Sequence, residues 1–267
     1  MHLNEPLNKV KIESILNTDS KAYLTRLEVH SSIDSTNDYL LAYAKNTLDA
    51  KSGVVCLAEE QTKGRGRQGK EWFSPKGNNI YCSLLWHVSA EIDLSQLSLA
   101  VAVIVTKALK RYGVSTGLQL KWPNDIYFAQ RKLAGILIET LPVRNQFVPI
   151  VIGLGLNLQL PTNHPLANTA IDIVEVTGVP AKRNQLAGLI IHELLINLPV
   201  YAQLGFAPFL AEWQQLDFLR GKLVIVQAPQ LTMTGYAEGI NEKGELVLRD
   251  ESGNRKWFRC GEVSVKV

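Results

Sequence analysis

The segment Lys63-Gly64-Arg65-Gly66-Arg67-Gln68-Gly69-Lys70 lies between apolar stretches that read as strands. Its glycines predict a loop, because they let backbone N–H groups come close to an anion, and its arginines add charge-assisted hydrogen bonds. The adjoining Trp72-Phe73-Ser74-Pro75 would anchor the end of that loop. We therefore expect residues 61–71 to bind a phosphate or a carboxylate. Taken alone, the segment is equally compatible with a mobile basic surface loop or with an RGG-like RNA contact.

Around this loop, the hydrophobic spacing predicts an α+β fold. The apolar stretches predict strands at Leu24–Val29, Gly53–Ala58, Asn79–Trp86, Leu118–Lys121, Ile126–Ala129, Lys132–Leu141 and Phe147–Leu160. Helical spacing or capping residues predict helices within Pro6–Asn17, from Asp34 or Ser35 onward, and over Leu97–Tyr112, Asn184–Leu198 and Phe206–Leu216. Pro199 should end or kink the fourth of these helices.

The pattern changes after Gly221. Short strands separated by turn residues are expected at Lys222–Gln227, Met233–Ile240, Glu245–Arg249 and Arg255–Phe258. We therefore divide the chain into an α+β domain, residues 1–220, and a small all-β domain, residues 221–267. The segment Pro161–Pro180 is expected to be rich in loops.

Composition excludes several classes of protein. The chain has 267 residues, 46% of them hydrophobic, and its 28 Lys+Arg against 25 Asp+Glu give a net charge of only +3. This charge argues against a surface that binds duplex DNA. The longest uncharged stretch, Asn145–Ile171, is interrupted by prolines and polar residues, so no membrane span is expected. Cys56, Cys82 and Cys260 form no CxxC pair, and a reducing, cytoplasmic setting fits best.

A second polar segment is Lys121-Trp122-Pro123-Asn124-Asp125. Pro123 restricts the backbone and would place Asn124 and Asp125 in a defined turn just beyond a strand. Asp125 could then hold a Mg²⁺ ion that bridges phosphates. The alternative is an Asn-Asp turn that caps local backbone groups.

Two further segments combine strands with glycine. Lys132 heads an apolar stretch and precedes Gly135, so its side chain could place a cation on a rigid strand and neutralise charge at a reacting centre. Alternatively, Lys132 is simply the last polar residue of a turn. Gly153 and Gly155 interrupt a strand before Asn157, which indicates either close approach of a ligand or backbone, or a bulge.

In this order, the segments resemble the biotin–protein ligases, also called biotin–[acetyl-CoA-carboxylase] ligases. The resemblance runs from Arg26 to the end of the chain. Its markers are Asp34-Ser35-Thr36-Asn37, Gln61 with the glycine–arginine loop, Trp72-Phe73-Ser74-Pro75, Lys121-Trp122-Pro123-Asn124-Asp125, Lys132-Leu133-Ala134-Gly135-Ile136-Leu137, Gly153-Leu154-Gly155-Leu156-Asn157, and the terminal Gly261–Ser264. The segment Thr169-Ala170-Ile171 departs from the Thr-Ser-Leu-like sequence that is common in the family.

The resemblance implies a mixed-sheet catalytic domain of the biotin/lipoate ligase type, residues 1–220, followed by an SH3-like barrel, residues 221–267. About twenty residues precede the match, so we expect the short, monofunctional form without a DNA-binding domain and without operator binding. It also implies two half-reactions. The biotin carboxylate attacks the α-phosphate of MgATP, and a lysine of a biotin carboxyl carrier protein then takes the biotinyl group.

Residue roles follow from the same resemblance. Catalysis is assigned to Lys132, Arg65 and Arg67, and the Mg²⁺ ion to Asp125. The biotin pocket is expected to contain Ser35, Thr36, Asn37, Gln61, Arg65, Gly66, Arg67, Trp72, Tyr81, Ser83, Lys132, Gly135, Leu137, Gly153 and Gly155. The nucleotide is expected to contact Arg67, Lys121, Asn124, Lys132 and Asn157.

Two alternatives stay open at this point. A lipoate–protein ligase would share the fold and the chemistry, but lipoate has no ureido group and would not need the Ser35-Thr36-Asn37 cluster. An RNA-binding protein could use the basic loop, but that function leaves Lys121–Asp125 and Lys132–Leu137 unexplained. The partners we expect are biotin, ATP and a carrier domain, with no membrane, and the chain is expected to be a monomer or a weak homodimer.

Overall fold

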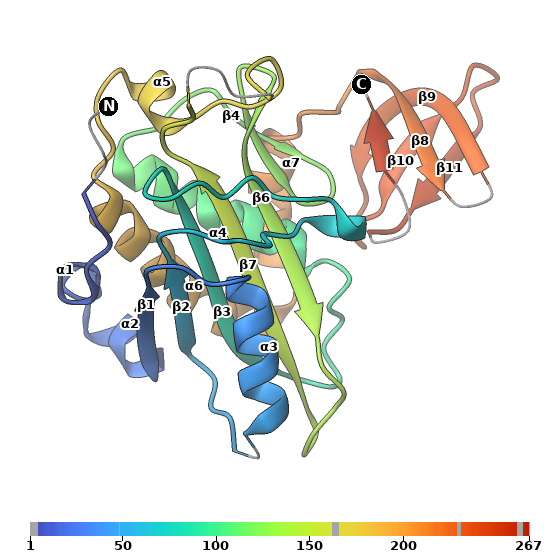
Figure 1. The fold of residues 1–267 in the computed structure, drawn as a ribbon. Coiled ribbons are helices and arrows are strands. Elements are labelled where there is room, and N and C mark those ends of the chain that lie inside the picture. Colours follow the sequence, from blue (N-terminus) through green and yellow to red (C-terminus); the bar gives the residue numbers. More distant parts are fainter. Residues whose placement is uncertain (1–4, 48, 162–165, 229–230, 261–263, 267) are drawn as a thin grey trace.

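The computed structural model describes residues 5–266 except residue 48 and residues 162–165, 229–230 and 261–263. Seven strands form the larger sheet in the order β1-β2-β3-β7-β6-β5-β4 (Figure 1). Their bounds are β1 Arg26–His30, β2 Val54–Ala58, β3 Asn79–Ser89, β4 Leu118–Lys121, β5 Asp125–Phe128, β6 Arg131–Thr140 and β7 Phe147–Asn157. Only β1 and β2 pair in parallel and the other pairs are antiparallel, which confirms a mixed sheet in an α+β fold.

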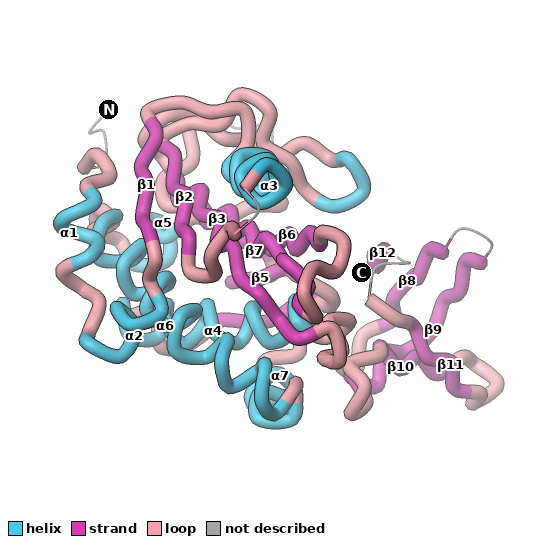
Figure 2. The backbone as a smooth tube through the Cα atoms, turned by 90° about the horizontal axis from the view of Figure 1, so that it is seen from below, coloured by secondary structure: helices cyan, strands magenta, loops and turns pink. Residues whose placement is uncertain are grey.

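Helices cover both faces of this sheet (Figure 2). One face carries α3 (Thr36–Asn46), and the other carries α4 (Leu97–Tyr112) and α6 (Arg183–Leu204). The remaining helices are α1 (Lys9–Glu13), α2 (Thr18–Tyr23), α5 (Ile173–Thr177) and α7 (Ala207–Gln215). Because both faces are covered, the central strands β3 and β7 are buried along most of their length and read as continuous apolar runs.

Two helical features differ from the expectation. The helix α6 does not end at Pro199 but continues to Leu204. The proline removes one backbone hydrogen bond, yet packing beyond it is strong: Tyr201 is buried and its hydroxyl donates to the Asp93 carbonyl at 2.6 Å. The short α5 lies in the segment that we expected to be loop-rich, where Asp172 caps it by accepting from the Glu175 N–H at 2.8 Å.

The helix α6 is long and apolar enough to cross a membrane by length and composition alone. Within the protein, however, 67% of its most apolar window is buried against other elements. It therefore forms part of the hydrophobic core beside α4.

A smaller antiparallel sheet lies beside the larger one, at the right of Figure 1, in the order β11-β10-β9-β8-β12. Its strands are β8 Leu223–Ala228, β9 Leu231–Ile240, β10 Leu246–Arg249, β11 Arg255–Phe258 and β12 Ser264–Lys266. The strand β12 was not expected from the sequence, and most of the motif Gly261–Ser264 lies outside the described residues. The domain boundary at residue 220 stays a prediction.

The two sheets meet at Trp122. This side chain is buried, and its indole N–H donates at 3.0 Å to the carbonyl of Gly244, which lies in the turn between β9 and β10 of the smaller sheet. Gly244 has φ +68°, and a Cβ placed there would lie 2.7 Å from Leu99 Cδ1 of α4. The residues after α7 also pair with β4, because Leu120 donates to the Leu216 carbonyl at 2.7 Å and accepts from Phe218 at 2.9 Å. The smaller sheet is thus packed tightly against the edge of the larger one.

Candidate active site

A cleft of about 410 Å³ opens between the start of α3, the loop at residues 61–71 and strands β5 to β7. Most of the predicted site residues line it: Ser35, Thr36, Asn37, Gln61, Arg65, Gly66, Arg67, Trp72, Lys121, Asn124, Asp125, Lys132, Gly135, Leu137, Gly153 and Gly155. Val265 of β12 also lines the cleft, so the smaller sheet contributes to its wall. Sequence positions far apart are therefore brought together, while the role of each residue stays a prediction.

One end of the cleft is neutral and hydrogen-bonded, and we call it the head end: it is lined by Ser35, Thr36, Asn37 and Gln61, with the buried Ser83 behind them. Ser35 caps α3 by accepting from the Asp38 N–H at 3.3 Å. The Gln61 side-chain oxygen accepts from the backbone N–H of Thr36 at 2.9 Å and lies 3.1 Å from its hydroxyl. These side chains complete the otherwise unpaired N-terminus of the helix.

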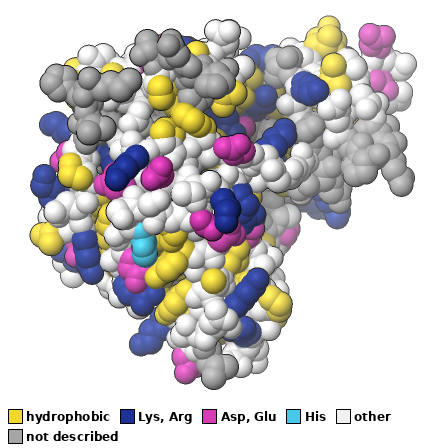
Figure 3. Space-filling model, in the orientation of Figure 1, with side chains coloured by type: hydrophobic (Ala, Val, Ile, Leu, Met, Phe, Trp, Pro, Cys, Tyr) yellow, Lys and Arg dark blue, Asp and Glu magenta, His cyan; other side chains and the backbone are white. Residues whose placement is uncertain are grey.

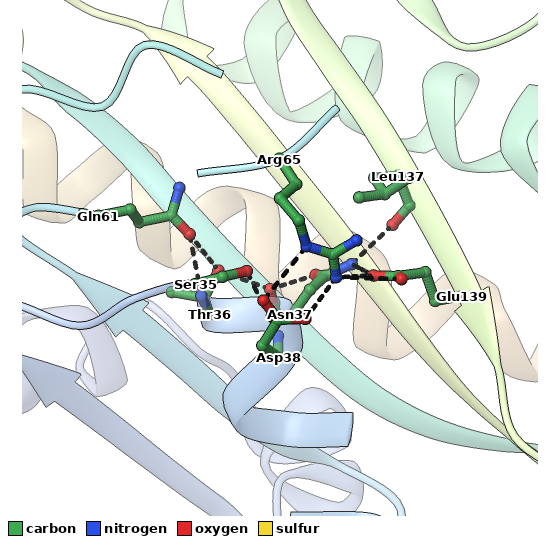
Figure 4. Close-up of polar contacts among 9 residues, drawn as sticks. Ser35, Thr36, Asn37, Asp38, Gln61, Arg65, Leu137 and Glu139 are labelled. Atoms are coloured by element: carbon green, nitrogen blue, oxygen red, sulfur yellow. Dashed lines mark hydrogen bonds and ion pairs between the residues drawn. The ribbon is translucent and has the colours of Figure 1, made fainter. Parts of the chain in front are cut away.

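Asn37 lies at the centre of the head end (Figure 4). Its amide nitrogen donates to Glu139 Oε2 at 2.9 Å and to the Leu137 carbonyl at 3.3 Å, and its oxygen accepts from the Ser83 hydroxyl at 2.6 Å. A Cβ at Gly153 would lie 2.2 Å from this oxygen, so the glycine makes room for Asn37. The sequence had indicated close approach of a ligand or backbone at Gly153, whereas the observed neighbour is a side chain.

Trp72 forms the apolar wall of the cleft. A Cβ at Gly155 would lie 2.3 Å from its indole, and one at Gly135 would lie 3.0 Å from it, so both glycines leave space for the ring. The Lys132 ammonium lies 5.2 Å from the centroid of the Trp72 ring, which is close enough for a cation–π contact. The indole N–H of Trp72 is buried and has no hydrogen-bond partner among the residues that the structure describes.

The two loop arginines have different surroundings. The Arg65 guanidinium bonds to Asp38 and, at 3.1 Å, to both carboxylate oxygens of Glu139 (Figure 4). The hydrogen bond to Asp38 raises the pKa of Arg65 above its usual value. Arg67 donates one bond, from Nη1 to Asn124 Oδ1 at 3.1 Å, while its Nη2 is buried without a partner in the described chain. Burial lowers the pKa of the Arg67 guanidinium.

The opposite end of the cleft carries Arg67, Lys121, Asp125 and Lys132, and we call it the charged end. The Lys132 ammonium lies 2.7 Å from Asp125 Oδ1. Burial lowers the pKa of Lys121, and repulsion from the nearby ammonium groups of Lys132, Lys222 and Lys70 lowers it further, while Asp125 opposes both effects. Cations thus outnumber carboxylates at this end, which favours an anionic ligand.

Three predicted residues lie behind the cleft and do not line it. Ser83 is buried beneath Asn37 and Thr36. The Tyr81 hydroxyl donates to the Pro75 carbonyl at 2.9 Å and so supports the end of the loop. Asn157 donates to the carbonyls of Lys132 at 3.3 Å and Ile171 at 3.1 Å, which ties β6 to the following segment.

The sequence analysis missed Asp38 and Glu139, the two partners of Arg65. Asp38 lies in the first turn of α3, where an acidic residue is favourable in any helix, so nothing in the sequence assigned it to the site. Glu139 carried a usable signal, because it is the first acid after Lys132 in an otherwise apolar strand. Buried or half-buried acids in such a position need a partner.

Comparison with known proteins agrees with this site. Residues 29–157 match the Biotin/lipoate A/B protein ligase family, and residues 221–266 match the Biotin protein ligase C terminal domain. These matches place the chain in the class of biotin and lipoate ligases. It is 34% identical to the bifunctional ligase/repressor BirA of Escherichia coli strain K12, over 99% of this chain and 80% of that protein.

The chain also aligns with nearly the whole length of two further proteins. The biotin–[acetyl-CoA-carboxylase] ligase of Paracoccus denitrificans is 30% identical, over 83% of this chain and 93% of that protein. A structure of the biotin protein ligase from Aquifex aeolicus in complex with biotin and ATP aligns with a TM-score of 0.78 and 27% identity, over 91% of this chain and 99% of the other. The chain belongs to the biotin protein ligase family.

Proposed function

We propose that the protein is an ATP-dependent biotin–[biotin carboxyl carrier protein] ligase. In the first half-reaction, a biotin carboxylate oxygen attacks the α-phosphorus of MgATP and pyrophosphate leaves, giving biotinyl-5′-AMP. In the second, the ε-amine of a carrier lysine attacks the acyl carbon, loses a proton, and AMP leaves. The observation that supports this best is a single cleft with a neutral hydrogen-bonding end, an apolar tryptophan wall and a cationic end.

The head end suits an uncharged polar group. A buried ureido group has both donors and acceptors, and each needs a partner. Ser35, Thr36, Asn37 and Gln61 offer hydroxyl and amide groups that can act in both ways. Lipoate has no ureido group and would leave these side chains without a matching ligand, so the head end favours biotin.

The charged end suits the reacting groups. The first half-reaction brings a carboxylate and a triphosphate together, and these repel unless cations are already in place. Lys132 and Arg67 lie on the cleft wall between the loop and β6, and Arg67 Nη2 is buried without a partner in the described structure. We assign Lys132 to the carboxylate and α-phosphate, Arg67 to the phosphate and the retained adenylate, and Lys121 to the phosphates.

Asp125 is our candidate for contact with the magnesium that accompanies ATP. Among the described residues, no group of three or more His, Cys, Asp or Glu side chains is placed to hold a metal. A single carboxylate is nevertheless what an ion held mainly by phosphates and water requires. Such an ion would neutralise phosphate charge, while Lys132 holds Asp125 in position at 2.7 Å.

An RNA-binding function for the basic loop finds no support. Arg65 is already paired with two carboxylates, and on the face shown in Figure 3 Lys and Arg side chains are interspersed with Asp and Glu. As part of the proposal we keep a cytoplasmic location, in which the thiols of Cys56, Cys82 and Cys260 stay unpaired as the structure has them.

The direct test is transfer of biotin to a purified biotin carboxyl carrier domain, read by mass spectrometry. We expect a mass increase of one biotinyl group on the carrier that requires both ATP and Mg²⁺, with pyrophosphate formed even when the carrier is left out. Isothermal titration calorimetry with biotin and with lipoate shows which acid binds, and so distinguishes a biotin ligase from a lipoate ligase. Modification with lipoate in place of biotin would overturn the proposal.

A further inference from the structure

Glu139 is the point at which the head end and the glycine–arginine loop meet. One of its oxygens accepts from Asn37 Nδ2 at 2.9 Å, and both accept from Arg65 Nη2 at 3.1 Å (Figure 4). It lies on β6, whereas Asn37 lies on α3 and Arg65 on the loop. A single carboxylate thus joins three separate segments of the cleft wall.

The charges around Arg65 define its role. Asp38 and Glu139 together carry two negative charges against one positive charge and engage the Nε and Nη2 of Arg65, so the guanidinium is held in place by the cleft wall. Arg67 differs, because its Nη2 is buried and has no partner in the described chain. The geometry therefore suits Arg65 to anchoring the loop, while Arg67 keeps a buried donor that a bound anion can use.

Glu139 also fixes the orientation of the Asn37 amide. An ionised carboxylate accepts hydrogen bonds and donates none, so it selects the nitrogen end of the amide. The Leu137 carbonyl, 3.3 Å from the same nitrogen, selects it as well. The oxygen end must then face Ser83 and Gly153, where it accepts from the Ser83 hydroxyl.

We propose that Glu139 is a positioning residue of the biotin site, which orients the Asn37 amide for the ligand head group and anchors the loop through Arg65. This inference rests on the proposed function. Asp38 shares only the second task, because its side-chain bonds run to Arg65 and not to Asn37. The two acids should therefore have separable effects.

The test compares three conservative variants. Glu139→Gln removes the charge and lets the side chain donate as well as accept. Asp38→Asn weakens the loop anchor alone. Glu212→Gln is the matched control, since the Glu212 side chain is 27% exposed against 26% for Glu139 and is likewise ion-paired, but it lies on α7 and pairs with Lys110 of α4.

Two measurements separate the tasks. Titration calorimetry gives the biotin Kd without ATP, and limited trypsin digestion with mass mapping gives the rate of cleavage after Arg65 and Arg67. For Glu139→Gln we expect the biotin Kd to rise about tenfold and cleavage to accelerate, since a hydrogen bond to a charged group is lost. Asp38→Asn should accelerate cleavage with a smaller change in Kd, and Glu212→Gln should change neither.

A double-mutant comparison then tests the route through Asn37. In an Asn37→Ala background, Glu139→Gln should have little further effect on the biotin Kd, because the amide that Glu139 orients is gone. An undiminished effect there, or a Glu139→Gln variant with wild-type Kd, would overturn the proposal. If the wild-type protein itself bound no biotin, the proposed function would fail, and the cleavage rates would still decide whether Glu139 anchors the loop.

Discussion

The head end and the charged end of the cleft are built in opposite ways. At the head end, Asn37, Thr36 and Gln61 bond to one another or to neighbours, so the site is hydrogen-bonded before any ligand arrives. At the charged end, the Nη2 of Arg67 lacks a partner within the described chain, and the ammonium groups of Lys132, Lys222 and Lys70 repel that of Lys121. The first arrangement stabilises the fold, and the second does not.

This difference indicates which step each end serves. A neutral head group is the same in the substrate and in the transition state, so contacts with it contribute uniform binding. Negative charge at the reacting carboxylate and phosphate develops only during the reaction, and preplaced cations act on it most strongly then. Substitutions at the head end should thus change affinity, and those at the charged end should change rate or retention of the adenylate.

The largest effect is expected for Lys132→Ala. Removing one preorganised charge at a reacting centre typically costs about 3–4 kcal/mol, or roughly a hundred- to thousandfold in rate. Biotin affinity should fall only modestly, because Lys132 does not touch the head end. Pyrophosphate release in a single turnover at saturating biotin and ATP measures this rate. Lys110→Ala, which breaks an ion pair of similar exposure on α4, serves as the control.

Next in size is Arg67→Gly. We expect adenylate to form but to leave the cleft about ten- to a hundredfold faster, because the variant loses a buried guanidinium whose Nη2 has no partner among the described residues. Bystander proteins with exposed lysines that are added to the reaction should then become biotinylated. Arg67→Lys keeps the charge and should leak less. Loss of adenylate formation without leakage would move Arg67 from retention to catalysis.

For the head end, Asn37→Ala should raise the biotin Kd about tenfold while kcat at saturating biotin stays within about twofold. The same change should lower the free energy of unfolding by about 1–3 kcal/mol, because the buried Ser83 and the half-buried Glu139 each lose a hydrogen-bond partner. Calorimetry, steady-state kinetics and urea unfolding measure the three quantities. A fall in kcat as large as that of Lys132→Ala would abolish the distinction between the two ends.

The smallest effect, and the one of opposite sign, is expected for Lys121→Met. The wild-type ammonium is disfavoured by burial, so the variant should melt roughly 1–3 °C higher at neutral pH while binding ATP about fivefold more weakly. Because the pKa of Lys121 is lower in the folded than in the unfolded protein, wild-type stability rises with pH toward the ordinary lysine pKa of 10.5. The difference in Tm should therefore shrink as the pH is raised, and a constant difference would contradict this reasoning.

Much of the fold could be predicted because its signals are local. The helix α4 was predicted with its observed ends, since a largely apolar run is followed by Gly113, which adopts φ +117° and stops the helix. The extension of α6 through Pro199 could not be predicted, because it depends on the burial of Tyr201 against residues distant in sequence.

The candidate site likewise has one part that local sequence signals predict and another part that depends on tertiary packing. Ser35 and the glycine–arginine loop carry short-range signals of capping and of close backbone approach. That Asp38 and Glu139 meet Arg65 depends on how α3, the loop and β6 pack together, which spacing along the chain does not encode. Likewise, nothing in the sequence around Val265 indicated that β12 would reach the cleft.

The contact between Trp122 and Gly244 has a consequence for genetics. A side chain at residue 244 would press on Leu99, and shifting this turn would break the bond from the Trp122 indole, which neighbours Lys121 in the chain. A selection for cells that lose protein biotinylation should thus recover substitutions at Gly244 alongside those in the cleft. Compensating mutations should then be sought in α4, at residues that make room for the displaced turn.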